Sequence, residues 1–118
     1  MGYRSIVIIG VKEGKLSNEF DKILKKHEYN PTKSNEWLKI GEKDGMKTYI
    51  FDYVKWYSSD DWIKEIEEFI EKIVGDVALP DSAFLIGMGE EGEIHTEYGN
   101  HWGYVDIIRD LKLRENQN

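Results

Sequence analysis

Apolar residues follow two periods along this chain, and each period predicts a different element. Residues 3–11 form a nearly continuous apolar run rich in β-branched side chains, which indicates a central strand buried on both faces. Residues 46–57 alternate in the two-residue period of a strand. Residues 35–41 indicate another strand, and Asp44-Gly45 between the two segments is a strong hairpin-turn signal.

Two other segments repeat their apolar residues at the helical spacing of three and four. In the first, Ser17 is positioned to cap a short helix that stops before Asn30-Pro31. The second covers residues 61–74, and Gly75 fits the left-handed conformation that ends many helices. The faces predicted to be buried consist of Phe20, Ile23, Leu24 and His27 in the first helix, and Trp62, Ile66, Phe69, Ile70 and Ile73 in the second.

The remaining segments complete an element order of β-α-β-β-α-β with a terminal extension. Residues 83–88 predict the fourth strand, and residues 94–98 and 102–108 predict a closing hairpin. This order is that of the split βαβ motif. We therefore expect a ferredoxin-like α+β fold, with an antiparallel sheet, two helices on one face and a C-terminal β-hairpin extension.

The third predicted strand carries Tyr49, Phe51, Tyr53 and Tyr57 on one face. Such a row could form a stacking platform for a base, a nucleotide or a peptide. It could instead form the core beneath the two helices, and this second interpretation is favoured. The periodicity does not decide which face the helices cover, because Ile50 and Val54 make the opposite face equally suitable as core.

The composition narrows the function classes. With 118 residues, the chain is expected to form one domain, 1–118, with a folded core over 1–110 and a polar tail over 111–118. The net charge of −7 and the scattered Lys residues disfavour duplex nucleic acid as a ligand, although an acidic protein can occupy a nucleic-acid site. The absence of Cys excludes disulfides and Cys-ligated zinc. We expect no secretory signal and no membrane span, because no apolar run approaches ~20 residues.

Arg4 beside Tyr3 is the first candidate for chemistry. A guanidinium near the edge of a sheet can hold a phosphate or carboxylate through two parallel hydrogen bonds. The alternative is a structural ion pair with one of the 23 acidic residues.

Glu93, His95 and Glu97 are the second candidate, since carboxylates and imidazole bind divalent metals or transfer protons. Alternate strand positions point in parallel and do not converge, so we expect no metal site. A polar, solvated hairpin face is the favoured interpretation. A hydrolase built on Glu93, His95 and His101 is the least favoured functional class, because no nucleotide-binding or nucleophile-elbow motif is present.

Tryptophan is the third candidate, because Trp and Tyr are enriched at the centres of interfaces. We expect Trp37 and Trp62 to lie in the core. Trp102, which follows a turn with His101 beside it, is the best candidate for an exposed anchor.

The opening Met1-Gly2-Tyr3-Arg4-Ser5, together with Val54-Lys55-Trp56-Tyr57, resembles a group of short phage-encoded proteins that share both motifs. Ile6 departs from the group at a position where an acidic residue is expected in many members. The resemblance implies a phage accessory protein in the cytoplasm of the host bacterium, and it implies no particular reaction.

We therefore expect a non-catalytic protein that counteracts host antiviral defence by sequestering a small anionic, nucleotide-like signalling ligand, with a homo-oligomer as the expected state. The alternative is a protein–protein inhibitor, anti-CRISPR-like or an acidic mimic, that docks on a host defence protein. No cofactor and no metal are expected. The candidate ligand-binding residues are Tyr3, Arg4, Lys55, Trp56, Tyr57, His101, Trp102 and Tyr104.

Overall fold

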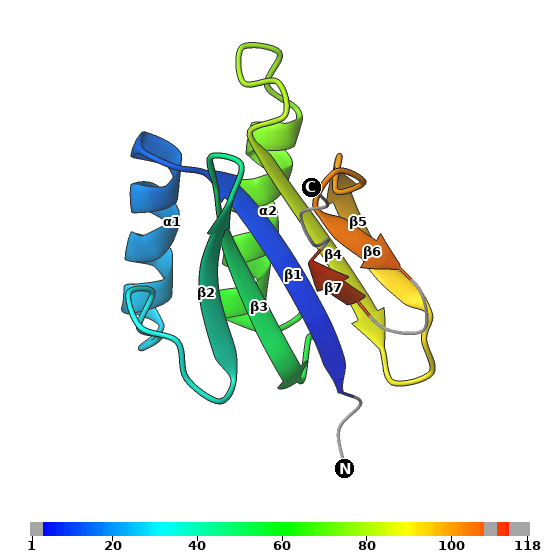
Figure 1. The fold of residues 1–118 in the computed structure, drawn as a ribbon. Coiled ribbons are helices and arrows are strands. Elements are labelled where there is room, and N and C mark those ends of the chain that lie inside the picture. Colours follow the sequence, from blue (N-terminus) through cyan, green and yellow to red (C-terminus); the bar gives the residue numbers. More distant parts are fainter. Residues whose placement is uncertain (1–3, 108–110, 114–118) are drawn as a thin grey trace.

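A computed structural model describes residues 4–107 and 111–113 of the chain, and all structural statements below concern these residues. It contains two helices and seven strands (Figure 1). In chain order these are β1 (Ser5–Lys12), α1 (Lys15–Lys26), β2 (Leu38–Lys43), β3 (Met46–Val54), α2 (Asp61–Val74), β4 (Ala83–Gly89), β5 (Ile94–Gly99), β6 (Val105–Ile107) and β7 (Leu111–Leu113).

Five of the strands form one antiparallel sheet in the order β2-β3-β1-β4-β5. Both helices cover one face of this sheet, and the small two-stranded β6–β7 sheet lies on the other (Figure 1). The expected α+β class, antiparallel sheet and pair of helices are therefore confirmed. Neither helix in the described part of the chain has the length and apolar character needed to cross a membrane.

Strand β1 is apolar on both of its faces because each face packs against a different layer. Its odd-numbered residues Val7, Ile9 and Val11 pack with α1 and α2, and we call this side the helix face. Ile8 points the opposite way, to the front face, where Val105 of β6 packs with it. Because side chains alternate along a strand, the continuous apolar run serves two separate cores.

The turn between β2 and β3 forms as predicted, whereas the start of α1 differs from the prediction. Asp44 and Gly45 both have positive φ, 52° and 81°, and they close the predicted hairpin between β2 and β3. The first helix begins two residues before the expected cap, with Gly14 at the N-cap position. Ser17 lies in the first turn instead, where its Oγ accepts a hydrogen bond of 3.0 Å from the Gly14 N–H.

The aromatic row of β3 is divided by a bulge. Tyr49 and Phe51 lie in the core beneath the helices, as favoured above. An irregularity opposite Ser5 and Val7 then inserts an extra residue into β3. Because an extra residue shifts the alternation by one, Tyr53 emerges on the front face with 58% of its surface exposed.

The C-terminal strands pair differently from the predicted closing hairpin. Residues 94–99 form β5 and pair with β4, whose residues are all buried and would otherwise leave an edge of unpaired backbone. Residues 105–107 pair with Leu111–Leu113, which lies in the segment expected to be a tail. The prediction that Trp37 lies in the core was wrong: it precedes β2, where an Asn35 turn leaves it 51% exposed, whereas Trp62 packs in the core.

Candidate functional site

Two hollows meet at the first residues of β1. One lies on the front face and has a volume of about 370 Å³; we call it the Arg4 hollow. The other lies on the helix side and has a volume of about 530 Å³; we call it the Ser5 hollow. The Arg4 hollow is lined by Arg4, Ser5, Ile6, Asp52, Tyr53, Met88, Gly89 and Glu90. The Ser5 hollow is lined by Ser5, Trp56, Tyr57, Ser58, Ser59, Glu93, His95 and Thr96.

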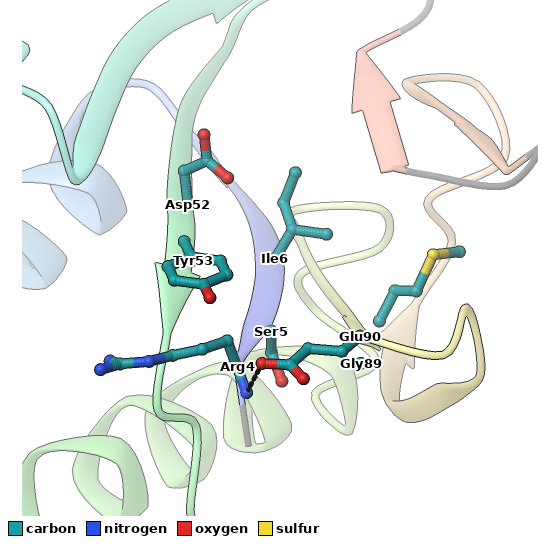
Figure 2. A pocket seen from close by; sticks show the side chains of 8 residues that line it. Arg4, Ser5, Ile6, Asp52, Tyr53, Gly89 and Glu90 are labelled. Atoms are coloured by element: carbon teal, nitrogen blue, oxygen red, sulfur yellow. Dashed lines mark hydrogen bonds between the residues drawn. The ribbon is translucent and has the colours of Figure 1, made fainter. Parts of the chain in front are cut away.

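The guanidinium of Arg4 lies over an aromatic ring. Its Cζ is 5.5 Å from the centroid of the Tyr53 ring, within cation–π distance. The Arg4 backbone N–H donates a 2.8 Å hydrogen bond to Oε1 of Glu90, while the guanidinium extends away from that carboxylate (Figure 2). Among the ion pairs found in the described residues, none involves Arg4. The guanidinium hydrogen-bonding edge is thus free of a carboxylate partner there.

Tyr53 is held in an unusual backbone conformation. Its φ of 57° lies in the left-handed region, which a bulky side chain rarely adopts. Strain of this kind persists only where neighbouring structure imposes it, and it clusters at functional sites. Here the bulge in β3 imposes it and presents the ring beneath Arg4. Asp52, the second acidic group of the hollow, has Lys39 at 3.9 Å to offset its charge.

A chain of side-chain contacts crosses the Ser5 hollow. Ser5, which is 5% exposed, places its Oγ 2.9 Å from Nε2 of His95. The other ring nitrogen, Nδ1, lies 2.8 Å from Oγ1 of Thr96. Burial lowers the pKa of His95, although the negative charges of Glu93 and Glu67 act in the opposite direction. The imidazole is consequently neutral at pH 7.

Gly87 makes room for this histidine. A Cβ built on Gly87 would lie 2.7 Å from Cε1 of His95, closer than side-chain carbons come. The ring therefore lies directly against the β4 backbone. Behind it, the Glu67 carboxylate accepts hydrogen bonds from Trp56 Nε1 at 2.9 Å and from Ser58 Oγ at 2.8 Å, and this buried network fixes one wall of the hollow.

The residues predicted to bind a ligand are not brought together. Arg4 lines one hollow, Trp56 and Tyr57 line the other, and exposed Lys55 lines neither. Trp56 is mostly a core residue, only 6% exposed. Tyr3 lies outside the described residues.

The remaining predicted residues lie in and beside the turn before β6. His101 is fully buried and bonded to Glu97, and its Nδ1 has no hydrogen-bond partner within the described chain. Tyr104 stacks on Phe84 with ring centroids 5.2 Å apart. Trp102 is 61% exposed, which confirms the expectation that it is accessible. Glu97 is hydrogen-bonded to His101, whereas His95 contacts Ser5. The described residues hold no group of three or more potential ligands able to bind a metal ion.

Sequence reasoning missed Tyr53 as the partner of Arg4 and Ser5 as the partner of His95. The first depends on a β-bulge, for which the sequence carries no glycine signal. The second joins residues 90 positions apart. Comparison with protein-family models, with curated proteins and with solved structures gave no match to this chain.

Proposed function

We propose that this protein binds a small anionic, nucleotide-like ligand in the Arg4 hollow and thereby withholds it from host antiviral signalling. The observation that carries the proposal is the Arg4 guanidinium, which lies over the Tyr53 ring and has no carboxylate partner in the described residues. Such sequestration requires binding and no catalysis.

The chemistry of the hollow suits a ligand with a phosphate and a planar base. Arg presents a planar fork of donors that matches phosphate geometry, and it retains its charge at all physiological pH values. The exposed Tyr53 ring offers a stacking surface, and stacking of a base on an aromatic ring contributes roughly 1–3 kcal/mol. Both nearby acidic groups have partners already, since Glu90 accepts the Arg4 N–H and Asp52 lies near Lys39.

The wider setting of the proposal rests on the sequence. The two shared motifs support a phage accessory protein acting in the host bacterial cytoplasm, and shared sites between subunits of a homo-oligomer would raise affinity for a scarce ligand. We also propose that the fold is ferredoxin-like, because β2-β3-β1-β4 with two connecting helices is the strand arrangement that the split βαβ pattern produces.

A specific observation favours a second candidate, inhibition of a host defence protein by direct docking. Trp102 and Trp37 expose 61% and 51% of their surfaces, and exposed Trp side chains are frequent anchors of protein interfaces. This mechanism predicts that Trp102→Ala abolishes inhibition, whereas Arg4→Ala has no effect.

Calorimetric titration with cyclic di-AMP and with AMP as probes tests the first proposal. We expect Arg4→Ala to weaken binding at least 10-fold and Arg4→Lys to recover only part of the loss, since Lys keeps the charge but not the fork. Lys55→Ala is the matched control, because it removes one exposed positive charge outside the hollow and should bind like the wild type. Equal loss in Lys55→Ala and Arg4→Ala would contradict a site at Arg4.

A further inference from the structure

The Ser5 hollow contains a hydroxyl and a basic nitrogen in contact, and the proposed ligand binding at Arg4 uses neither. We propose that Ser5 is a nucleophile activated by His95 and that it accepts the acyl group of small, uncharged esters. The proposal is independent of the Arg4 hollow. It rests on the geometry around His95, on the charge of the hollow and on the space beside Ser5.

Each imidazole nitrogen contacts one hydroxyl group, and because a hydroxyl can donate or accept, the tautomer of the ring sets the roles of the two nitrogens. Thr96 lies 2.8 Å from Nδ1 and Ser5 lies 2.9 Å from Nε2. When Nδ1 carries the proton and donates to Thr96, Nε2 is left with its lone pair toward the Ser5 hydroxyl. This is the arrangement of a nucleophile, a general base and an orienting group.

The position of the base is built into the sheet. Without a side chain at Gly87, the His95 ring lies against β4 and reaches back to the first residue of β1. Ser5 and Thr96 hold it from two sides. His95 is itself solvent-exposed, and these two contacts restrain its ring. The 530 Å³ hollow leaves space for a substrate beside the pair.

The charge of the hollow selects the substrate class. Among the described residues that line it there is no Lys or Arg, while Glu93 lies at its rim and the carboxylate of Glu67 lies behind its wall. A phosphate or a carboxylate would be repelled there. An uncharged ester avoids that repulsion, and the Trp56 indole and the Tyr57 ring provide apolar surface for its acyl or alcohol part.

The reaction follows from these positions. The Ser5 oxygen attacks the ester carbonyl as its proton passes to Nε2 of His95, and a C–O bond forms. The tetrahedral adduct then expels the alcohol, which leaves with the proton held by His95. An acyl-Ser5 and a free alcohol remain. Water attacks the acyl group with His95 again as base, releases the carboxylic acid and restores Ser5.

Incubation of the intact protein with p-nitrophenyl acetate tests this proposal, with peptide mass spectrometry to locate the acetyl group. We expect one acetyl group on Ser5 and a burst of p-nitrophenolate. His95→Gln should slow acetylation of Ser5 at least 10-fold. His27→Gln, which changes a histidine bonded to Glu65 and absent from the lining of the hollow, should leave the rate unchanged.

The pH profile provides a readout that a merely structural histidine would not give. Burial favours the neutral form of His95, whereas Glu93 from the segment before β5 and Glu67 from α2 favour the charged form. Because the base must be neutral, the rate of Ser5 acetylation should rise with pH to a plateau, with a midpoint below the ordinary His pKa of ~6.5. Acetyl groups on Lys or Tyr with none on Ser5, or an unchanged rate in His95→Gln, would overturn the proposal. Both results are read on wild type and on His95→Gln whose fold is checked by circular dichroism, so the test needs no substitution of the part-buried Ser5.

Discussion

The strained backbone at Tyr53 allows a direct test of whether this residue is retained for its ring. Tyr53 has a φ of 57°, a conformation that only glycine adopts without steric cost. We predict that Tyr53→Gly is more stable than Tyr53→Ala. This order is the reverse of that expected inside an ordinary strand, where glycine is less favourable than alanine by roughly 0.5–1 kcal/mol.

Three contributions set the difference in unfolding free energy between Tyr53→Gly and Tyr53→Ala. Both substitutions remove the ring, which is 58% exposed, so the lost burial and the lost contact with Arg4 together cost about 1–2 kcal/mol. Alanine keeps the left-handed steric penalty of about 1–2 kcal/mol, whereas glycine removes it. Part of this advantage of glycine is lost, because a chain with glycine has a larger conformational entropy when unfolded. The net expectation is a difference of about 1 kcal/mol in favour of Tyr53→Gly.

Urea unfolding followed by tryptophan fluorescence measures this difference, because Trp56 is 6% exposed when folded and becomes solvated on unfolding. The same pair of substitutions at Ile50, an ordinary position of β3, is the control and should show alanine more stable than glycine. Both Tyr53 variants should lose ligand binding alike. Equal stability of the two Tyr53 variants, or a more stable alanine, would show that the backbone at Tyr53 carries no steric penalty that glycine relieves.

Three further substitutions test other parts of the structure. Gly87→Ala should lower the free energy of unfolding by about 1–3 kcal/mol and slow Ser5 acetylation, since its Cβ would meet His95 at 2.7 Å. In the control Gly103→Ala, the Cβ meets nothing within 4 Å, and the loss should be less than about 0.5 kcal/mol. Thermal unfolding compares the two variants. Glu67→Ala should cost about 2–4 kcal/mol in urea unfolding, because the Trp56 and Ser58 donors lose their acceptor. The hydrogen bond from His27 and the charge of Lys26 lower the pKa of the Glu65 carboxyl. Its contribution to stability is therefore present above pH ~4.5 and is lost as the pH falls through the lowered pKa. The stability difference between wild type and Glu65→Gln should shrink from pH 6 to pH 3, and a constant difference would contradict the assignment.

The elements with strong local signals could be predicted from the sequence. Helix α2 has the predicted bounds, and Asp44-Gly45 forms the predicted turn. The limits of β2 and the start of α1 differ by a few residues, because a turn of Asn35 and the Gly14 cap compete with the apolar pattern. These are local effects, and they leave the element order intact.

The sites could not be predicted, because they depend on register and on long-range pairing. A single extra residue in β3 moves Tyr53 from the helix face to the front face, beside Arg4. His95 reaches Ser5 only because β5 joins the sheet next to β4 and Gly87 leaves room. The sequence identified Arg4 and His95 as candidates but supplied neither partner.

Native mass spectrometry can show whether the Arg4 hollow holds a small anionic ligand, as we propose. The wild type and Arg4→Ala would be purified from bacteria in which an antiviral defence system is active. We predict that the wild type carries a discrete extra mass of a few hundred daltons that Arg4→Ala lacks while both remain folded. A bare wild type under these conditions, or the same extra mass on Arg4→Ala, would contradict the account.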